Sequence, residues 1–158
     1  MQNKEYEYLD LLGKGLDPYQ EKACCRTENT IIAAGAGSGK TQVLASRFAW
    51  LVMSKNIPAN KILTLTFTNK AAAEMYQRIY QSLVEVSKNP KTPAKEKARA
   101  KQAIEDFSEV HIQTLDSYCK NIVSQAANRY GISPDFSIGS SDSDLQLQAL
   151  QFVLKHRE

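Results

Sequence analysis

The chain carries the stretch AAGAGSGKT at residues 33–41, between a β-rich segment and a helix-forming segment. Residues 29–33 favour a strand and residues 40–54 favour a helix, which gives the strand, glycine loop and helix order of a phosphate-binding loop. Glycines at every second position let successive N–H groups turn into one concavity at the positive end of the following helix. The alternative is a glycine-rich turn that binds nothing, which requires this spacing to arise by chance.

The residues that follow the glycines have the chemistry that a triphosphate requires. Lys40 supplies a positive charge for the β- and γ-phosphates, and the Thr41 hydroxyl is a ligand for Mg²⁺. Ala34 stands at the first position of the usual pattern, where a glycine is more common, and it keeps the side-chain volume small. We therefore predict a nucleoside triphosphate site with Lys40 and Thr41 as its catalytic residues.

Composition is that of an ordinary globular chain. The 158 residues are 42% hydrophobic and 23% charged, which suits one domain or a piece of one. The net charge of +3 is compatible with a nucleic-acid partner and equally with none. There is no long apolar run, and residues 1–15 lack the core of a secretory signal, so we expect a cytoplasmic protein with no membrane partner. Cys24, Cys25 and Cys119 lack metal-ligand spacing and favour reduced thiols.

Strands and helices alternate along the chain. Residues 61–66 form a second β-rich run, residues 69–86 favour a helix, and residues 110–112 form a third strand candidate before a helix closed by Gly131. This alternation predicts an α/β fold with a parallel sheet flanked by helices. Upstream, Asp17 as N-cap and a proline in the first turn predict a short helix to about residue 26.

Residues 88–101 (KNPKTPAKEKARAK) are rich in lysine and contain a single acid. We interpret them as a linker that enters a solvated helix running to Phe107. The segment could contact DNA phosphates, but charge runs are usually solvated faces, and we favour that reading. Beyond residue 132 the chain starts polar and then shows an amphipathic helical pattern.

Four motifs occur in a fixed order: LDPYQ (16–20), AAGAGSGKT (33–41), LTFTNKAAAEM (65–75) and QTLDSYC (113–119). In this combination the chain resembles the N-terminal part of the UvrD/Rep superfamily of ATP-dependent DNA helicases, which includes the AddA and RecB helicase-nucleases. The resemblance implies a P-loop, RecA-like fold. We expect residues 1–132 to be part of the ATP-binding domain 1A, with a basic insert at about 86–107. Residues 133–158 would begin helical subdomain 1B, which makes this an incomplete first motor domain.

The resemblance implies ATP and Mg²⁺ as cofactors. Gln20 matches a glutamine whose amide donates to and accepts from the adenine edge, and Tyr19 beside it could flank the base or simply pack. Gln42 stands where the family often has a basic residue, which puts its contact with the nucleotide in doubt. The predicted nucleotide-binding residues are Gln20, Ala34, Gly35, Ala36, Gly37, Ser38, Gly39, Lys40, Thr41 and Gln42, with Thr41 as the Mg²⁺ ligand.

The resemblance also implies single-stranded DNA, or DNA with a single-stranded end, as a partner. The positions that match the family's DNA track are Thr66, Phe67, Thr68, Asn69, Thr114, Asp116 and Ser117. Phe67 follows a strand, where an aromatic ring can stack on a base. In the alternative reading Phe67 belongs to the core and the threonines only cap the helix. Asp116 replaces a histidine common in the Rep-like branch and is closer to the AddA-like branch.

The sequence contains no DExx motif. Phosphoryl transfer also needs a carboxylate that orients water and arginines that stabilise the developing charge, so these would come from the remaining helicase domains of a longer parent chain. We expect that parent to be an ATP-dependent DNA helicase of DNA repair, and this chain to bind ATP and DNA without turnover. The alternative is a stand-alone P-loop module that regulates without helicase activity.

Overall fold

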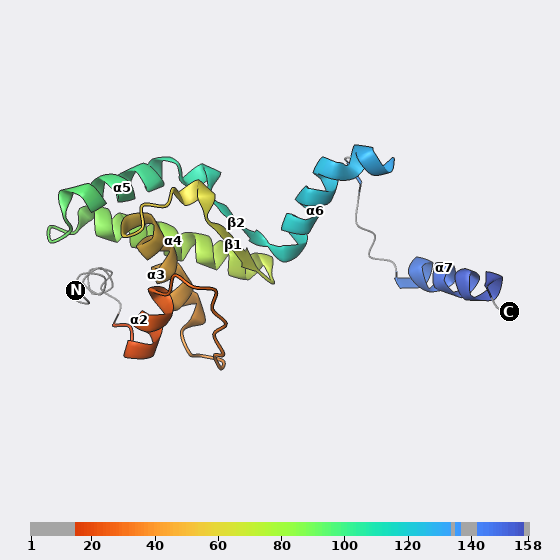
Figure 1. Ribbon diagram of the computed structural model, residues 1–158, viewed down its shortest axis with the longest axis horizontal. Helices are drawn as coiled ribbons and strands as arrows, with labels where there is room; N and C mark the ends of the chain where they lie inside the picture. The colour runs from red at the N-terminus through yellow and green to blue at the C-terminus, as the bar shows by residue number, and fades with distance from the viewer. Residues whose placement is uncertain (1–14, 134, 137–141, 157–158) are drawn as a thin grey trace. The chain divides into compact units, whose positions relative to one another are not determined.

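Figure 1 shows the computed structural model, which describes residues 15–133, 135–136 and 142–156, with the side chains of 142–145 excepted. Residues 1–14, which bear on the absence of a secretory signal, lie outside the described part. The chain falls into two compact units, divided between Tyr118 and Cys119. The first unit contains the glycine loop and the sheet.

Helix α2 (Pro18–Cys24) begins as the sequence predicts. The Asp17 carboxylate caps it, accepting from the backbone N–H groups of Tyr19 and Gln20 at 2.8 and 2.9 Å. The Gln20 side chain accepts in return from the Asp17 N–H at 2.9 Å, which completes a capping box. The helix ends at Cys24, slightly earlier than the sequence suggested.

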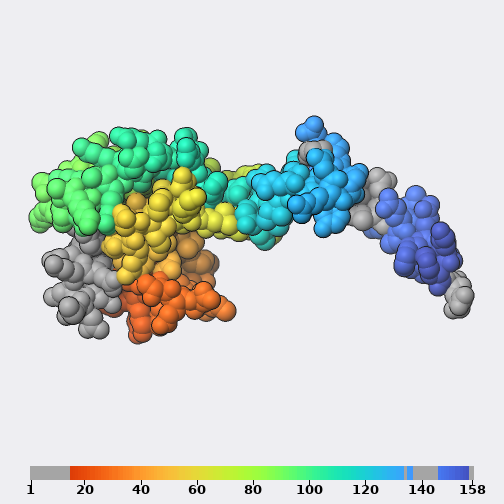
Figure 2. Space-filling model, turned by 45° about the horizontal axis from the view of Figure 1, so that its top comes forward, coloured from red at the N-terminus to blue at the C-terminus, as the bar shows by residue number. Residues whose placement is uncertain are grey.

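The core of the first unit lies between three longer helices, α3 (Lys40–Met53), α4 (Asn69–Lys88) and α5 (Ala94–Glu105). Helix α4 buries apolar residues at helical spacing, and α3 buries most of its C-terminal half. In Figure 2, α4 and α5, in green, form one packed surface. The largest fully buried apolar side chains are Trp50, Met53, Ile79, Leu83 and Val86.

The sheet is parallel, as predicted, and has two strands in the described part of the chain. Strand β1 (Leu63–Thr66) pairs with β2 (His111–Thr114), with Thr66 opposite Thr114. The short 3₁₀ helices η1 (Ala59–Lys61) and η2 (Phe107–Glu109) precede the strands. Helix α4 contacts both strands. Leu63, on the face of the sheet opposite α4, is 43% exposed. Parallel sheets of α/β proteins are normally covered on both faces.

The predicted strand over residues 29–33 is wrong. These residues precede the glycine loop without strand pairing, and the side chain of Ile31 is 100% exposed. A strand exists only through hydrogen bonds to a neighbour, and both described strands are paired with each other. The β-forming residues of this segment are thus not paired with any strand in the described part of the chain.

The basic segment 88–101 does not form a single charged face. Helix α4 continues to Lys88, and α5 packs on α3 and α4 through Ala100 and Ala103. Because a helix turns 100° per residue, the basic side chains of α5 fall on both flanks of this buried stripe. Figure 1 shows α5 lying along α4. The helix is therefore packed on the core and not wholly solvated: Lys91, Lys95 and Lys101 are exposed, whereas Arg99 donates to the Met53 carbonyl.

The second unit begins within α6 (Leu115–Ala126), which is followed by η3 (Ala127–Tyr130) and α7 (Asp142–Lys155). Gly131, at φ 67°, ends η3 in the left-handed conformation, as the sequence predicted. Among the described residues, no helix combines the length and hydrophobicity required to cross a bilayer.

Candidate nucleotide site and nucleic-acid interface

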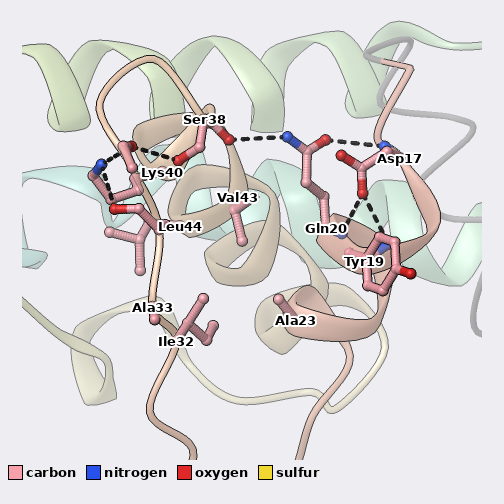
Figure 3. Close-up of a pocket in the computed structure, with 12 residues that line it drawn as sticks. Asp17, Tyr19, Gln20, Ala23, Ile32, Ala33, Ser38, Lys40, Val43 and Leu44 are labelled. Carbon is pink, nitrogen blue, oxygen red and sulfur yellow. Dashed lines mark hydrogen bonds between the residues drawn. The ribbon is translucent and has the colours of Figure 1, made fainter.

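A pocket of about 430 Å³ opens between α2, residues 32–35 and the start of α3. This volume lies in the range of small-molecule sites. Figure 3 shows Gln20 and Asp17 on one side of it and Lys40 and Ser38 on the other. Of the predicted nucleotide-binding residues, those that line the pocket are Gln20, Ala34, Gly35, Ser38 and Lys40.

The glycine loop presents a helix N-terminus without a side-chain cap. Gly39 is the N-cap of α3, in the left-handed conformation with φ 76°, and no side chain bonds the first N–H groups. The first turn also lacks an acidic residue. The N–H groups at the positive end of the helix are therefore left for an anion. Ser38 closes the loop, because its hydroxyl donates to the Gly35 carbonyl at 2.8 Å.

The Lys40 ammonium is folded back onto the loop. Its Nζ donates to the carbonyl oxygens of Ala34, at 3.1 Å, and of Gly35. The side chain is exposed to solvent, so a phosphate can reach it. A charged phosphate oxygen is a stronger acceptor than a neutral carbonyl, and Lys40 can exchange one for the other with a small movement.

The Gln20 carboxamide is held in one orientation. Its Oε1 accepts from the Asp17 N–H at 2.9 Å, and its Nε2 donates to the Ser38 carbonyl at 3.1 Å, as Figure 3 shows. One N–H and one oxygen lone pair stay available for a ligand. A Cβ added at Gly39 would lie 3.0 Å from Nε2, so this close approach favours glycine there in addition to the positive φ.

Tyr19 and Gln42, which the sequence analysis considered for the nucleotide site, lie in different places relative to the pocket. Tyr19 lines the pocket and is 85% exposed, so it is available to a base. Gln42 instead donates from Nε2 to the Ser46 hydroxyl at 3.3 Å, one turn along α3, and does not line the pocket. The predicted nucleotide contact of Gln42 is therefore not supported by the geometry, because its amide is committed within the helix.

The predicted DNA-contacting residues gather at the carboxyl edge of the sheet. Thr66 and Thr114 are opposite each other in the register of β1 and β2, so the loops that follow them are adjacent. Phe67 is 88% exposed, and the alternative that it belongs to the core is wrong. Thr68 does cap α4, accepting from the Ala71 N–H at 3.1 Å. The exposed first residue of α4 is Asn69.

The second loop at this edge is ordered by its own hydroxyl groups. The Thr114 and Ser117 hydroxyl oxygens are 2.8 Å apart, and the Ser117 N–H donates to Thr114 Oγ1 at 3.2 Å. Ser117 and Asp116 are both exposed, whereas Thr114 is buried. The edge therefore offers an aromatic face, hydroxyl groups and helix N-termini, which are the groups that hold a single strand.

Arg47 is a residue of this region that the sequence analysis missed. From α3 its NH1 donates to the carbonyl oxygens of Cys24, at 2.9 Å, and Ala23, at 3.3 Å, in the last turn of α2. The available signal was a lone arginine about two turns into the helix, in a mainly apolar stretch from Val43 to Met53.

The comparisons with known proteins agree with one another. A family model described as the UvrD/REP helicase N-terminal domain matches residues 16–158. The ATP-dependent DNA helicase PcrA of Bacillus subtilis is 35% identical over 90% of this chain and 16% of its own length. DNA helicase II of Haemophilus influenzae is 36% identical over 94% of this chain and 18% of its own length.

A helicase of a different kind also matches. One component of the ATP-dependent helicase/nuclease of Alkaliphilus metalliredigens is 34% identical over 80% of this chain and 10% of its own length. The chain thus spans less than a fifth of the length of these relatives.

The thiols differ in burial. Cys24 is buried and donates from Sγ to the Val43 carbonyl at 3.3 Å, and desolvation, followed by the neighbouring Cys25, raises its pKa to about 12. Because the thiolate is the nucleophile, we expect iodoacetamide at pH 8 to modify the exposed Cys119 and to leave Cys24 unmodified in the folded chain. Peptide mass spectrometry measures both. Equal labelling of both without denaturant would contradict this burial.

Proposed function

The chain belongs to the UvrD/REP helicase N-terminal domain family, and from this we propose that it is the ATP-binding N-terminal part of a DNA helicase. The parent would couple ATP hydrolysis to translocation on DNA and its unwinding. The observation that carries the proposal is the pocket in which the Gln20 carboxamide and the Lys40 ammonium face one glycine loop. In this proposal Gln20 would bind the base and Lys40 the phosphates within one pocket.

The residues of this pocket fit ATP with Mg²⁺. The uncapped N–H groups of α3 and the Lys40 ammonium suit the phosphates, and the remaining donor and acceptor of Gln20 suit the adenine edge. The Thr41 hydroxyl, at the first turn of α3, would be a ligand for the metal. Bound Mg²⁺ would neutralise charge on the β- and γ-phosphates.

Single-stranded DNA would bind at the carboxyl edge of the sheet, on Phe67 and the two threonine-containing loops. Stacking on an exposed ring and contacts from hydroxyl and N–H groups are sequence-tolerant, which suits an enzyme that moves along a strand. The relatives are named as DNA helicases, which supports DNA as the substrate class.

Turnover would require the rest of the parent. The chain contributes the phosphate loop and one metal ligand, while the carboxylate for water and the arginines for the transition state would belong to the remaining helicase domains. We therefore propose binding without turnover for this chain, with residues 1–132 in domain 1A and 133–158 opening subdomain 1B, in a cytoplasmic parent. The alternative of a stand-alone regulatory module is not favoured, because the relatives are named as helicases.

Replacing Lys40 tests the nucleotide site. We expect Lys40→Ala to weaken binding of ATP with Mg²⁺ by about tenfold or more, because a charge-assisted bond to phosphate contributes about 1.5–3 kcal/mol. Calorimetry measures the change, with Lys95→Ala on the exposed surface of α5 as the control. Equal affinity for ATP in Lys40→Ala and the unaltered chain would refute the phosphate site. Equal affinity of the unaltered chain for GTP and ATP would refute the role of Gln20.

Replacing Phe67 tests the nucleic-acid interface. We expect Phe67→Ala to weaken binding of a labelled single-stranded oligonucleotide by about tenfold, since stacking contributes about 1–3 kcal/mol per base. Fluorescence anisotropy measures this, and Tyr130→Ala, which removes another exposed ring, is the control. If Phe67→Ala binds the oligonucleotide with unchanged affinity and charge reversal in residues 88–101 abolishes binding, the basic segment is the DNA-binding site and Phe67 is not.

A further inference from the structure

Helix α2 is short and depends on its neighbours for its position. It contains seven residues, and isolated helices of that length are not stable in water. Yet it carries Gln20, whose carboxamide must meet both the loop and an adenine. The position of Gln20 therefore depends on the contacts that hold α2 against α3.

Arg47 supplies one of these attachments, beside the buried Cys24, whose Sγ donates to the Val43 carbonyl at 3.3 Å. One guanidinium nitrogen donates to the Cys24 carbonyl at 2.9 Å and the Ala23 carbonyl at 3.3 Å. These carbonyls lie in the last turn of α2, where acceptors lack helical partners and the helix dipole is negative, so a cation is favoured. The bonds are partly buried, which strengthens them relative to bonds in water.

The same residue joins the two halves of the pocket. Ala23 lies three positions after Gln20, so both side chains occupy the same face of α2, and both line the pocket. Arg47 lies on α3, whose first turn holds Lys40 and the uncapped N–H groups. Arg47 on α3 therefore holds the C-terminal end of α2 by hydrogen bonds, while Gln20 on α2 donates to the Ser38 carbonyl of the glycine loop.

We propose that Arg47 is a positioning residue for base selection, which fixes α2 so that Gln20 reads adenine at a set distance from the phosphate loop. It acts through the α2 carbonyls and does not contact the nucleotide. This inference rests on the proposed nucleotide site and adds a residue to it. Its consequence is that Arg47 contributes to the affinity for the base and not to the affinity for the phosphates.

The test uses three probes, each with Mg²⁺: ATP, GTP and inorganic tripolyphosphate. Arg47→Met removes the donors and keeps an unbranched stem beside the Trp50 ring, whose centroid lies 6.0 Å from the guanidinium carbon. We expect ATP binding to weaken about tenfold, tripolyphosphate binding to change less than about twofold, and the preference for ATP over GTP to disappear. Arg78→Met is the matched control, because Arg78 pairs with Glu74 on the surface of α4.

The outcomes separate the two claims. An unaltered chain that binds neither ATP nor tripolyphosphate refutes the proposed function itself. Equal weakening of all probes in Arg47→Met, or unchanged ATP binding, refutes the positioning role alone, as does an unaltered chain that binds ATP no better than tripolyphosphate. If thermal melting shows that Arg47→Met is unfolded, Arg47→Lys is the deciding variant, because it keeps the positive charge on a single donor nitrogen. We expect Arg47→Lys to lose less ATP affinity than Arg47→Met and to bind tripolyphosphate as the unaltered chain does.

Discussion

The burial of the C-terminal half of α3 is the constraint on which the site depends. Phe48 and Met53 are buried in the core that α3 forms with α4 and α5. Because a helix is stiff, fixing this end also fixes the other, where Lys40 and the uncapped N–H groups face the pocket. The first turn of α3 has no side-chain cap, and packing further along the helix holds it in place.

Polar groups of the pocket are satisfied by the loop itself. Lys40 donates to loop carbonyls, and Gln20 donates to the Ser38 carbonyl. A phosphate that binds here would replace loop carbonyls as the acceptor of the Lys40 bonds. The net binding free energy is therefore smaller than the full strength of each new hydrogen bond. The open pocket therefore destabilises the free chain little, and for the same reason we expect only a moderate affinity for the proposed nucleotide.

Local rules predicted much of this architecture, and long-range contacts explain what they missed. The cap at Asp17 and the helix that follows the glycines were readable because each depends on neighbouring residues. The parallel sheet was readable from the alternation of strand and helix segments along the chain. The strand over residues 29–33 failed because pairing depends on a partner distant in the sequence. Arg47 escaped notice for the same reason, since its acceptors on α2 precede it by more than twenty positions.

The central claim is that nucleotide and single-stranded DNA use separate surfaces of the first unit. Backbone amide NMR tests it directly, by titrating the chain with a non-hydrolysable ATP analogue and Mg²⁺, and separately with an oligothymidine. We expect the analogue to shift the amide signals of Gln20 and residues 34–41, and the oligonucleotide to shift those of residues 66–69 and 114–117. Signals that move together for both ligands, or only within residues 88–101, would contradict it.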